Sequence, residues 1–156
     1  MKKWAFLAIL FGMLLNMNAQ TNQKFETDNF SIKYPDLWQV TNDEGIINVY
    51  PDSEIGAITI SGYKDLNLDS SQIKNLIISV LGSTEDESKI SQKTSKGITE
   101  YYYQYPDEKT SSYWIAKVLE KENLIYLITI NCTDKYWNGN FKNLFLETFN
   151  SFKLKK

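Results

Sequence analysis

Seven segments of the chain carry the residue pattern of β-strands. Phe30, Ile32 and Tyr34 alternate with polar residues, the period of a strand with one buried face, and the alternation resumes at Trp38 and Val40. The other strand-like segments are residues 46–50, 57–63, 89–94, 98–105, 112–120 and 124–132. Residues 121–123 are short enough to join the last two strands as a hairpin. The pattern therefore predicts three strands, an interruption, and four more strands.

A helical period interrupts the strands after residue 69. Apolar residues then recur at positions i, i+3, i+4, i+7 and i+8, which predicts an amphipathic helix; they are Ile73, Leu76, Ile77, Val80 and Leu81. Asp69 stands at the N-cap position, Gln72 completes a capping box, and Gly82 is the expected C-cap.

A second helix is predicted at the end of the chain. Phe141, Leu144, Phe145, Phe149 and Phe152 follow helical spacing. Thr133 and Asp134 could start this helix earlier, although Gly139 would weaken its first turn.

The predicted order βββ-α-ββββ-α indicates an α+β fold. Strands in runs with short links favour an antiparallel sheet with helices packed on it. Residues 124–132 are apolar on both faces, which predicts a central strand covered on both sides. We therefore expect an α/β/α sandwich with a central, mostly antiparallel sheet of about six to seven strands.

The first residues have the order of a secretory signal peptide. Lys2 and Lys3 precede an apolar run over residues 4–15, and Ala19 ends a short polar region. The apolar run is shorter than the ~20 residues that span a bilayer. We expect cleavage after Ala19, with an uncleaved anchor as the alternative. The predicted organisation is a signal peptide at 1–19, a flexible segment at 20–28 and one globular domain at 29–156, exported to the periplasm or medium.

Composition excludes several kinds of chemistry. The chain has no His, its 17 basic residues are all Lys, and Cys132 is the one cysteine. Without His there is no Ser-His or Cys-His nucleophile pair, and without Arg there is no guanidinium clamp. One cysteine allows no disulfide within the chain and no cysteine zinc site. Removing residues 1–19 leaves 15 Lys against 19 acidic residues, a net charge of −4, which argues against nucleic acid as a partner.

Three motifs together resemble a known superfamily. They are Phe30-x-Ile32-x-Tyr34-Pro35-x-x-Trp38-x-Val40, then Gly56-Ala57-x-Thr59-Ile60, and the closing Asn150-Ser151-Phe152. The set resembles the PsbP/DcrB-like superfamily, which includes the photosystem II extrinsic subunit PsbP, Ran-binding nuclear-import relatives and bacterial periplasmic DcrB-like proteins. The resemblance implies an α/β/α sandwich over about residues 25–153. Leu37 stands where members often have a small or polar residue, and the metal-associated His residues of the photosystem proteins are missing, so no functional residue carries over.

A cluster of aromatic residues is the main candidate for a binding site. It consists of Tyr101, Tyr102, Tyr103, Tyr105, Tyr113 and Trp114. Strand alternation places Tyr101, Tyr103 and Tyr105 on one face and Tyr102 on the other. Exposed tyrosines suit stacking on sugars or anchoring a partner protein, so the hypothetical binding residues are Tyr101, Tyr103, Tyr105 and Tyr113. The alternative is that these side chains fill the rim of the core.

Other motifs favour structural explanations. Asp65-x-Asn67-x-Asp69 imitates the start of a calcium loop but lacks its Gly and its final Glu, so a helix N-cap is the better interpretation. Ser71-x-x-Lys74 has the spacing of a nucleophile pair but occurs as often as chance predicts. The acidic residues 85–87 are expected to be solvated, and Cys132 to be a small buried hydrophobe.

These observations favour a secreted, non-enzymatic protein that binds a partner protein or a cell-envelope component. We expect no cofactor and no bound metal. The alternatives are a hydrolase that uses paired carboxylates, since general acid–base work would fall to Asp, Glu, Lys or Tyr, and a small-ligand-binding module.

Overall fold

The computed structural model describes residues 22–82 and 87–155, and the predicted signal peptide lies outside them. The main element is a seven-stranded antiparallel sheet of order β3-β4-β5-β9-β8-β7-β6. Its strands are β3 Gln39–Asp43, β4 Ile46–Asp52, β5 Gly56–Lys64, β6 Ser91–Ser95, β7 Ile98–Asp107, β8 Ser112–Lys121 and β9 Leu124–Thr133. The α+β class and the antiparallel sheet are confirmed.

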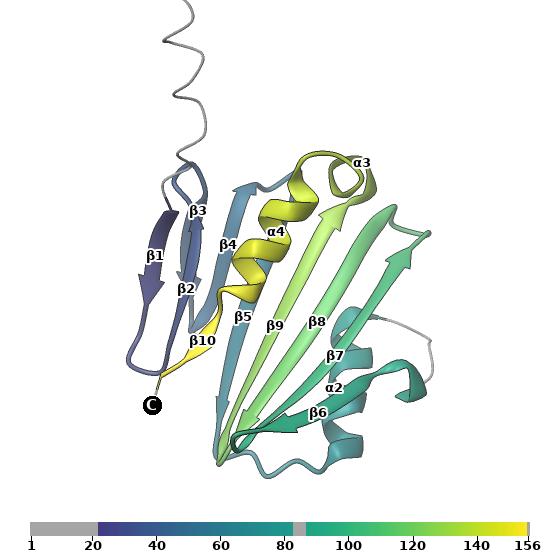
Figure 1. Ribbon diagram of the computed structural model, residues 1–156. Coiled ribbons are helices and arrows are strands. Elements are labelled where there is room, and N and C mark those ends of the chain that lie inside the picture. The colour runs from purple at the N-terminus through teal and green to yellow at the C-terminus, as the bar shows by residue number, and fades with distance from the viewer. Residues whose placement is uncertain (1–21, 83–86, 156) are drawn as a thin grey trace, which may run out of the picture.

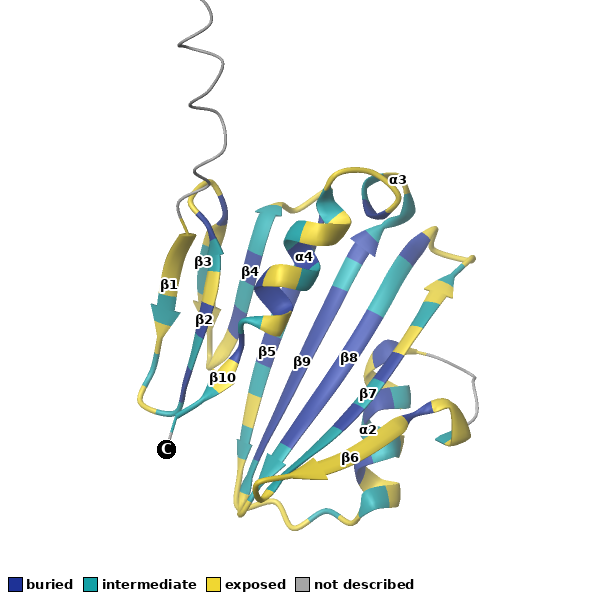
Figure 2. Cartoon of the chain, viewed as in Figure 1, coloured by how far each residue is buried: buried dark blue, intermediate teal, exposed yellow. Residues whose placement is uncertain are grey.

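Helices pack on both faces of this sheet, as predicted. Helix α4, Phe141–Asn150, lies in front of the sheet in Figure 1, and helix α2, Ser70–Leu81, lies behind it. The short helices α3, Asp134–Trp137, and η1, Glu87–Lys89, complete the described helical residues. Strand β9 occupies the centre of the sheet between β5 and β8, and both of its faces are buried (Figure 2).

Local sequence signals define α2. The Asp69 side chain accepts a hydrogen bond from the Gln72 backbone N–H at 2.9 Å, and the Gln72 side chain accepts one from the Asp69 N–H at 2.8 Å. Gly82 ends the helix in the left-handed conformation with φ +63°. The capping box and the glycine C-cap are confirmed, and Ile73, Ile77 and Leu81 form the buried face.

A second, three-stranded sheet was not predicted. It has the order β1-β2-β10, with β1 at Asn22–Glu26, β2 at Phe30–Pro35 and β10 at Lys153–Leu154. The expectation of a flexible segment at 20–28 is wrong for β1, because five consecutive residues of this polar strand pair with β2. The Glu26 carboxylate also binds Lys155 and Lys24, which lower its pKa to about 2.

The predicted C-terminal helix is interrupted. Residues 134–137 form α3, Asn138 and Gly139 break the helix, and α4 begins at Phe141. Glycine loses more conformational freedom in a helix than any other residue, which explains a break at this position. Ser151 then ties the end of α4 to β2, because its Oγ accepts from the Lys33 N–H at 2.8 Å and donates to the Thr148 carbonyl at 2.6 Å.

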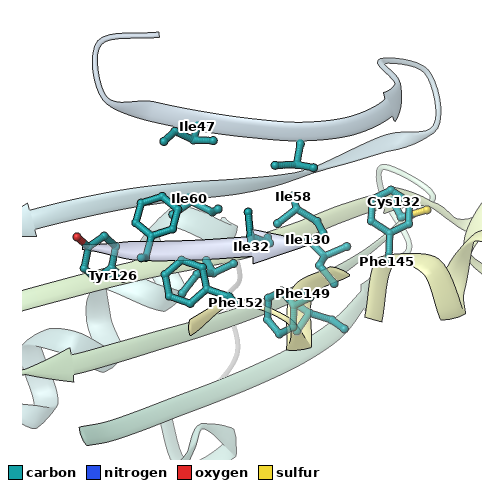
Figure 3. Packing of buried hydrophobic residues seen from close by; sticks show 14 of the residues in the cluster. Ile32, Ile47, Ile58, Ile60, Tyr126, Ile130, Cys132, Phe145, Phe149 and Phe152 are labelled. Carbon is teal, nitrogen blue, oxygen red and sulfur yellow. The ribbon is translucent and has the colours of Figure 1, made fainter. Parts of the chain in front are cut away.

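The larger core lies between α4, the small sheet and the front of the main sheet. Figure 3 shows Phe145, Phe149 and Phe152 packed against isoleucines of β2, β4, β5 and β9. Cys132 belongs to this core and is fully buried. The second core lies under α2 on the opposite face.

Candidate binding groove

The tyrosine cluster does not form an exposed patch. Tyr101 and Tyr103 are only 2% and 3% exposed, because α2 covers the face of β7 to which they point. The expectation that both rings are available to a ligand is therefore wrong. The interpretation that they fill the core explains their positions, and Tyr101 is among the largest fully buried side chains.

Tyr105 and Tyr113 are half-buried and lie on opposite faces of the sheet. Tyr105 stacks on Tyr103, and its hydroxyl donates to the Leu81 carbonyl at the end of α2 at 2.6 Å. Burial raises the pKa of Tyr105. Tyr113 stacks on Trp137 of α3 on the α4 face, with ring centroids 4.5 Å apart. The four candidate tyrosines therefore pack into two separate cores, one on each face of the sheet.

The α4 face of the main sheet has a groove at its β6 end. Helix α4 packs against β9 and β2, and the groove is lined by residues of β6, β7 and β8 and by the residues that follow α4. The groove has a volume of about 380 Å³. Its lining residues are Lys93, Ser95, Ile98, Glu100, Leu119, Phe152, Lys153 and Leu154. Sequence reasoning missed this groove, because its walls combine β6, β7 and β8 of the main sheet with β10 of the small sheet.

The polar residues of the groove are two lysines, one serine and one glutamate: Lys93, Lys153, Ser95 and Glu100. Lys93 forms an ion pair with Glu100 at 2.9 Å across the β6–β7 pair. Lys153 is exposed and has no ion pair within the described residues. Glu100 is the one carboxylate among the lining residues, so the groove does not provide the two carboxylates that glycoside-hydrolase chemistry requires.

A buried lysine lies beside the groove on the same face of β8. Lys117 is only 7% exposed and sits two residues from Leu119. Its Nζ lies 3.5 Å from the Phe149 carbonyl oxygen and 4.2 Å from the centroid of the Phe149 ring. A cation at a helix C-terminus is favourable because the last carbonyls carry partial negative charge. Burial nevertheless lowers the pKa of Lys117, since the charged form loses water.

Tyr102 lies opposite Lys117 in the β7–β8 register. Its hydroxyl donates to the Gln104 side chain at 2.9 Å, and burial is the main cause of its raised pKa. Tyr102 is therefore the cluster's aromatic ring nearest to Lys117 in the strand register, although it was not among the proposed binding residues.

The other sequence motifs have structural roles or lie elsewhere. Asp69 caps α2, and residues 85 and 86 of the acidic run lie outside the described residues. Burial raises the pKa of the Cys132 thiol to about 11, so the thiolate is scarce at neutral pH. Within residues 22–82 and 87–155, no three His, Cys, Asp or Glu side chains are grouped to share a metal ion.

Three solved structures are similar to this chain over most of its length. The solution structure of cyanobacterial PsbP (CyanoP) from Synechocystis sp. PCC 6803 matches 90% of this chain and 96% of its own, with a TM-score of 0.65 and 11% identity. LpqN, described as involved in cell envelope biogenesis of Mycobacterium tuberculosis, matches 89% of this chain and 88% of its own, with a TM-score of 0.50 and 10% identity. A protein from Bacteroides thetaiotaomicron VPI-5482 matches 88% of this chain at 20% identity and a TM-score of 0.48, and the chain spans about half (49%) of its length.

The matches to CyanoP and LpqN confirm the PsbP-like fold that the three sequence motifs indicate. No protein-family model and no curated protein sequence matches the chain. In the described part of the chain, no helix has the length and apolar character needed to cross a membrane.

Proposed function

We propose that this protein is an exported, non-enzymatic binding module that holds a partner protein or a cell-envelope component in the groove beside α4. The observation that carries the proposal is the groove itself, where apolar side chains and lysines meet on a part of the sheet that α4 leaves open. The description of LpqN, a protein of the same fold, as involved in cell envelope biogenesis supports this kind of role. The residues at the N-terminus support export.

A variant that fills the groove tests the role of this surface. Ser95 lines the groove, and the neighbouring Thr94 points to the opposite face of β6, so Ser95→Trp and Thr94→Trp form a matched pair of exposed substitutions. We expect immobilised wild type and Thr94→Trp to retain the same component from an envelope extract, and Ser95→Trp to lose it. Equal retention by all three proteins would remove the groove from the proposal.

Export is tested separately by mass spectrometry of the protein recovered from the cell envelope and the medium. The expected product begins at Gln20, after removal of residues 1–19. Recovery only of a chain that begins at Met1 would contradict export by this route.

A small-ligand-binding module is the second candidate. The groove volume of about 380 Å³ lies within the range of ligand pockets, about 300–1,000 Å³. A ligand that binds only the folded protein raises its melting temperature by mass action. We expect such a ligand to shift the melting temperature of Thr94→Trp but not of Ser95→Trp.

A further inference from the structure

Two of the strands that line the groove, β6 and β10, have an outer edge with no neighbouring strand among residues 22–82 and 87–155. Strand β6 is the last strand of the seven-stranded sheet, and β10 is the last strand of the three-stranded sheet. Both contribute lining residues to the groove. A strand at the edge of a sheet presents N–H and C=O groups that another chain can pair with.

The register of β10 determines which of its main-chain groups are available. The Lys155 N–H donates to the Asn29 carbonyl at 2.8 Å, and Lys153 and Leu154 lie opposite Ser31 and Phe30 of β2. In an antiparallel pair, hydrogen-bonded and non-hydrogen-bonded positions alternate. Leu154 therefore occupies a non-hydrogen-bonded position, and its N–H and C=O point away from β2 toward the open edge.

The side chains around this edge favour one kind of partner sequence. Phe152, Lys153, Leu154 and Lys155 alternate apolar and cationic residues along the end of the chain. Side chains on neighbouring strands interact with the residues directly opposite them, and opposite charges in such positions attract. Glu26 already binds Lys155, whereas Lys153 has no ion pair in the described residues. Lys153 is therefore available to an acidic residue.

We propose that the groove binds an extended peptide segment of a partner protein, with alternating apolar and acidic residues, which adds to β10 as a fourth strand. The apolar residues pack beside Leu154 and over Ile98 and Leu119, and the acidic residues face Lys153. The unpaired main-chain groups of Leu154 favour a peptide over an amphiphile, because an acyl chain offers them no hydrogen bond. This inference rests on the proposed binding function and specifies its partner.

Fluorescence polarisation with a labelled peptide tests the proposal. The probe is a peptide of about six alternating leucine and glutamate residues, the length of an average strand. A peptide of alternating leucine and lysine is its charge control. We expect saturable binding of the first peptide and much weaker binding of the second. Lys153→Glu should weaken binding by about fivefold or more, since an attractive cross-strand pair becomes repulsive.

Lys109→Glu is the matched control for this charge change. Lys109 is exposed in the β7–β8 turn, at the end of the hairpin opposite Ile98 and the groove. We expect Lys109→Glu to bind the peptide with the affinity of wild type. An equal loss of peptide affinity in Lys153→Glu and Lys109→Glu would overturn the proposed binding position, because the effect would then reflect only the net charge of the protein.

Backbone methylation of the peptide tests strand pairing directly. In an extended peptide, the N–H groups of alternate residues point to opposite edges. N-methylation of one set removes the N–H groups that face β10, and N-methylation of the other set leaves them in place. We expect methylation of the set that faces β10 to weaken binding by up to about tenfold, because it removes the hydrogen bond to the Leu154 carbonyl. Methylation of the other set should have little effect. Equal affinities of the two methylated peptides would overturn pairing with β10.

Sodium decanoate, an anionic amphiphile, is the probe for the competing kind of occupant of the groove. Saturable binding of decanoate that Ser95→Trp abolishes, without binding of the leucine–glutamate peptide, would overturn the peptide proposal. If the peptide fails while retention of an envelope component still depends on Ser95, the proposed function stands and only this inference about its partner is wrong.

Discussion

Replacing Lys117 with methionine should stabilise the protein at neutral pH. Methionine has a similar length and fills the same space, but it removes an ammonium group from a position that is only 7% exposed. The native interactions that this change removes are weak. They are the 3.5 Å contact with the Phe149 carbonyl and the cation–π contact with its ring.

The size of the effect follows from comparing these terms. The hydrogen bond and the cation–π contact contribute about 0.5–1.5 and about 0.5–2 kcal/mol. Burial of an ion costs several kcal/mol even after the protein relaxes. We therefore expect Lys117→Met to raise the free energy of unfolding by about 1–2 kcal/mol at pH 7. Lys117→Ala is the contrast, because it leaves a cavity and should lose part or all of this gain.

The pH dependence identifies the ammonium as the cause. Burial lowers the pKa of Lys117 in the folded protein, so between this pKa and its unfolded value of 10.5 the unfolded chain binds more protons. The stability of the wild type should then rise with pH through this window, and the advantage of Lys117→Met should shrink. Glu100 and Lys93 have smaller, opposing effects on the Lys117 pKa.

Urea unfolding of both proteins at a series of pH values between 7 and 10 provides the measurement. Subtracting the free energy of unfolding of wild type from that of Lys117→Met cancels the effect of groups that titrate in both proteins, including the partly buried tyrosines. A stability difference that stays constant or grows with pH would refute the reasoning. So would a Lys117→Met protein less stable than wild type at pH 7.

Three further predictions test the fold. Asp69→Ala should lower the free energy of unfolding in urea by about 1 kcal/mol, the usual effect of losing an N-cap, and Asp69→Asn should restore most of it. Gly56→Ala should be destabilising by more than about 2 kcal/mol, because a Cβ at φ +142° would overlap the Asn131 carbonyl. Gly45→Ala should lower the free energy of unfolding by less in the same assay, because Gly45 also has a positive φ but a Cβ there would meet no neighbouring atom. Cys132 should react with a thiol reagent only after unfolding, since it is fully buried, and rapid labelling of the native protein would contradict its position.

The elements that the sequence predicted correctly are those with local signals. Helix α2 has an apolar stripe, a capping box and a glycine C-cap, all within residues 69–82. Strand β1 has no such signal, because its polar sequence shows no periodicity and its structure depends on pairing with β2. The break between α3 and α4 depended on how strongly Gly139 would interrupt an otherwise helical pattern.

The candidate site was harder to predict, for a different physical reason. Alternation placed Tyr101 and Tyr103 together on one face of β7, but only the packing of α2 determines that this face is buried. The groove depends on which part of the opposite face α4 leaves open. Lys117 is a polar residue in a strand pattern, and its burial depends on Phe149, which is 32 residues away in the sequence.

The pairing of β10 with β2 has a consequence for the order of folding. The Ser151–Lys33 contact joins residues 118 positions apart, and the Lys155–Glu26 ion pair joins the two ends of the domain. Contacts between distant parts of a chain form slowly, because a long loop must close first. The small sheet and the end of α4 therefore depend on contacts that close most of the domain into one loop. We therefore expect the small sheet and its contacts with α4 to form after the local hairpins of the main sheet.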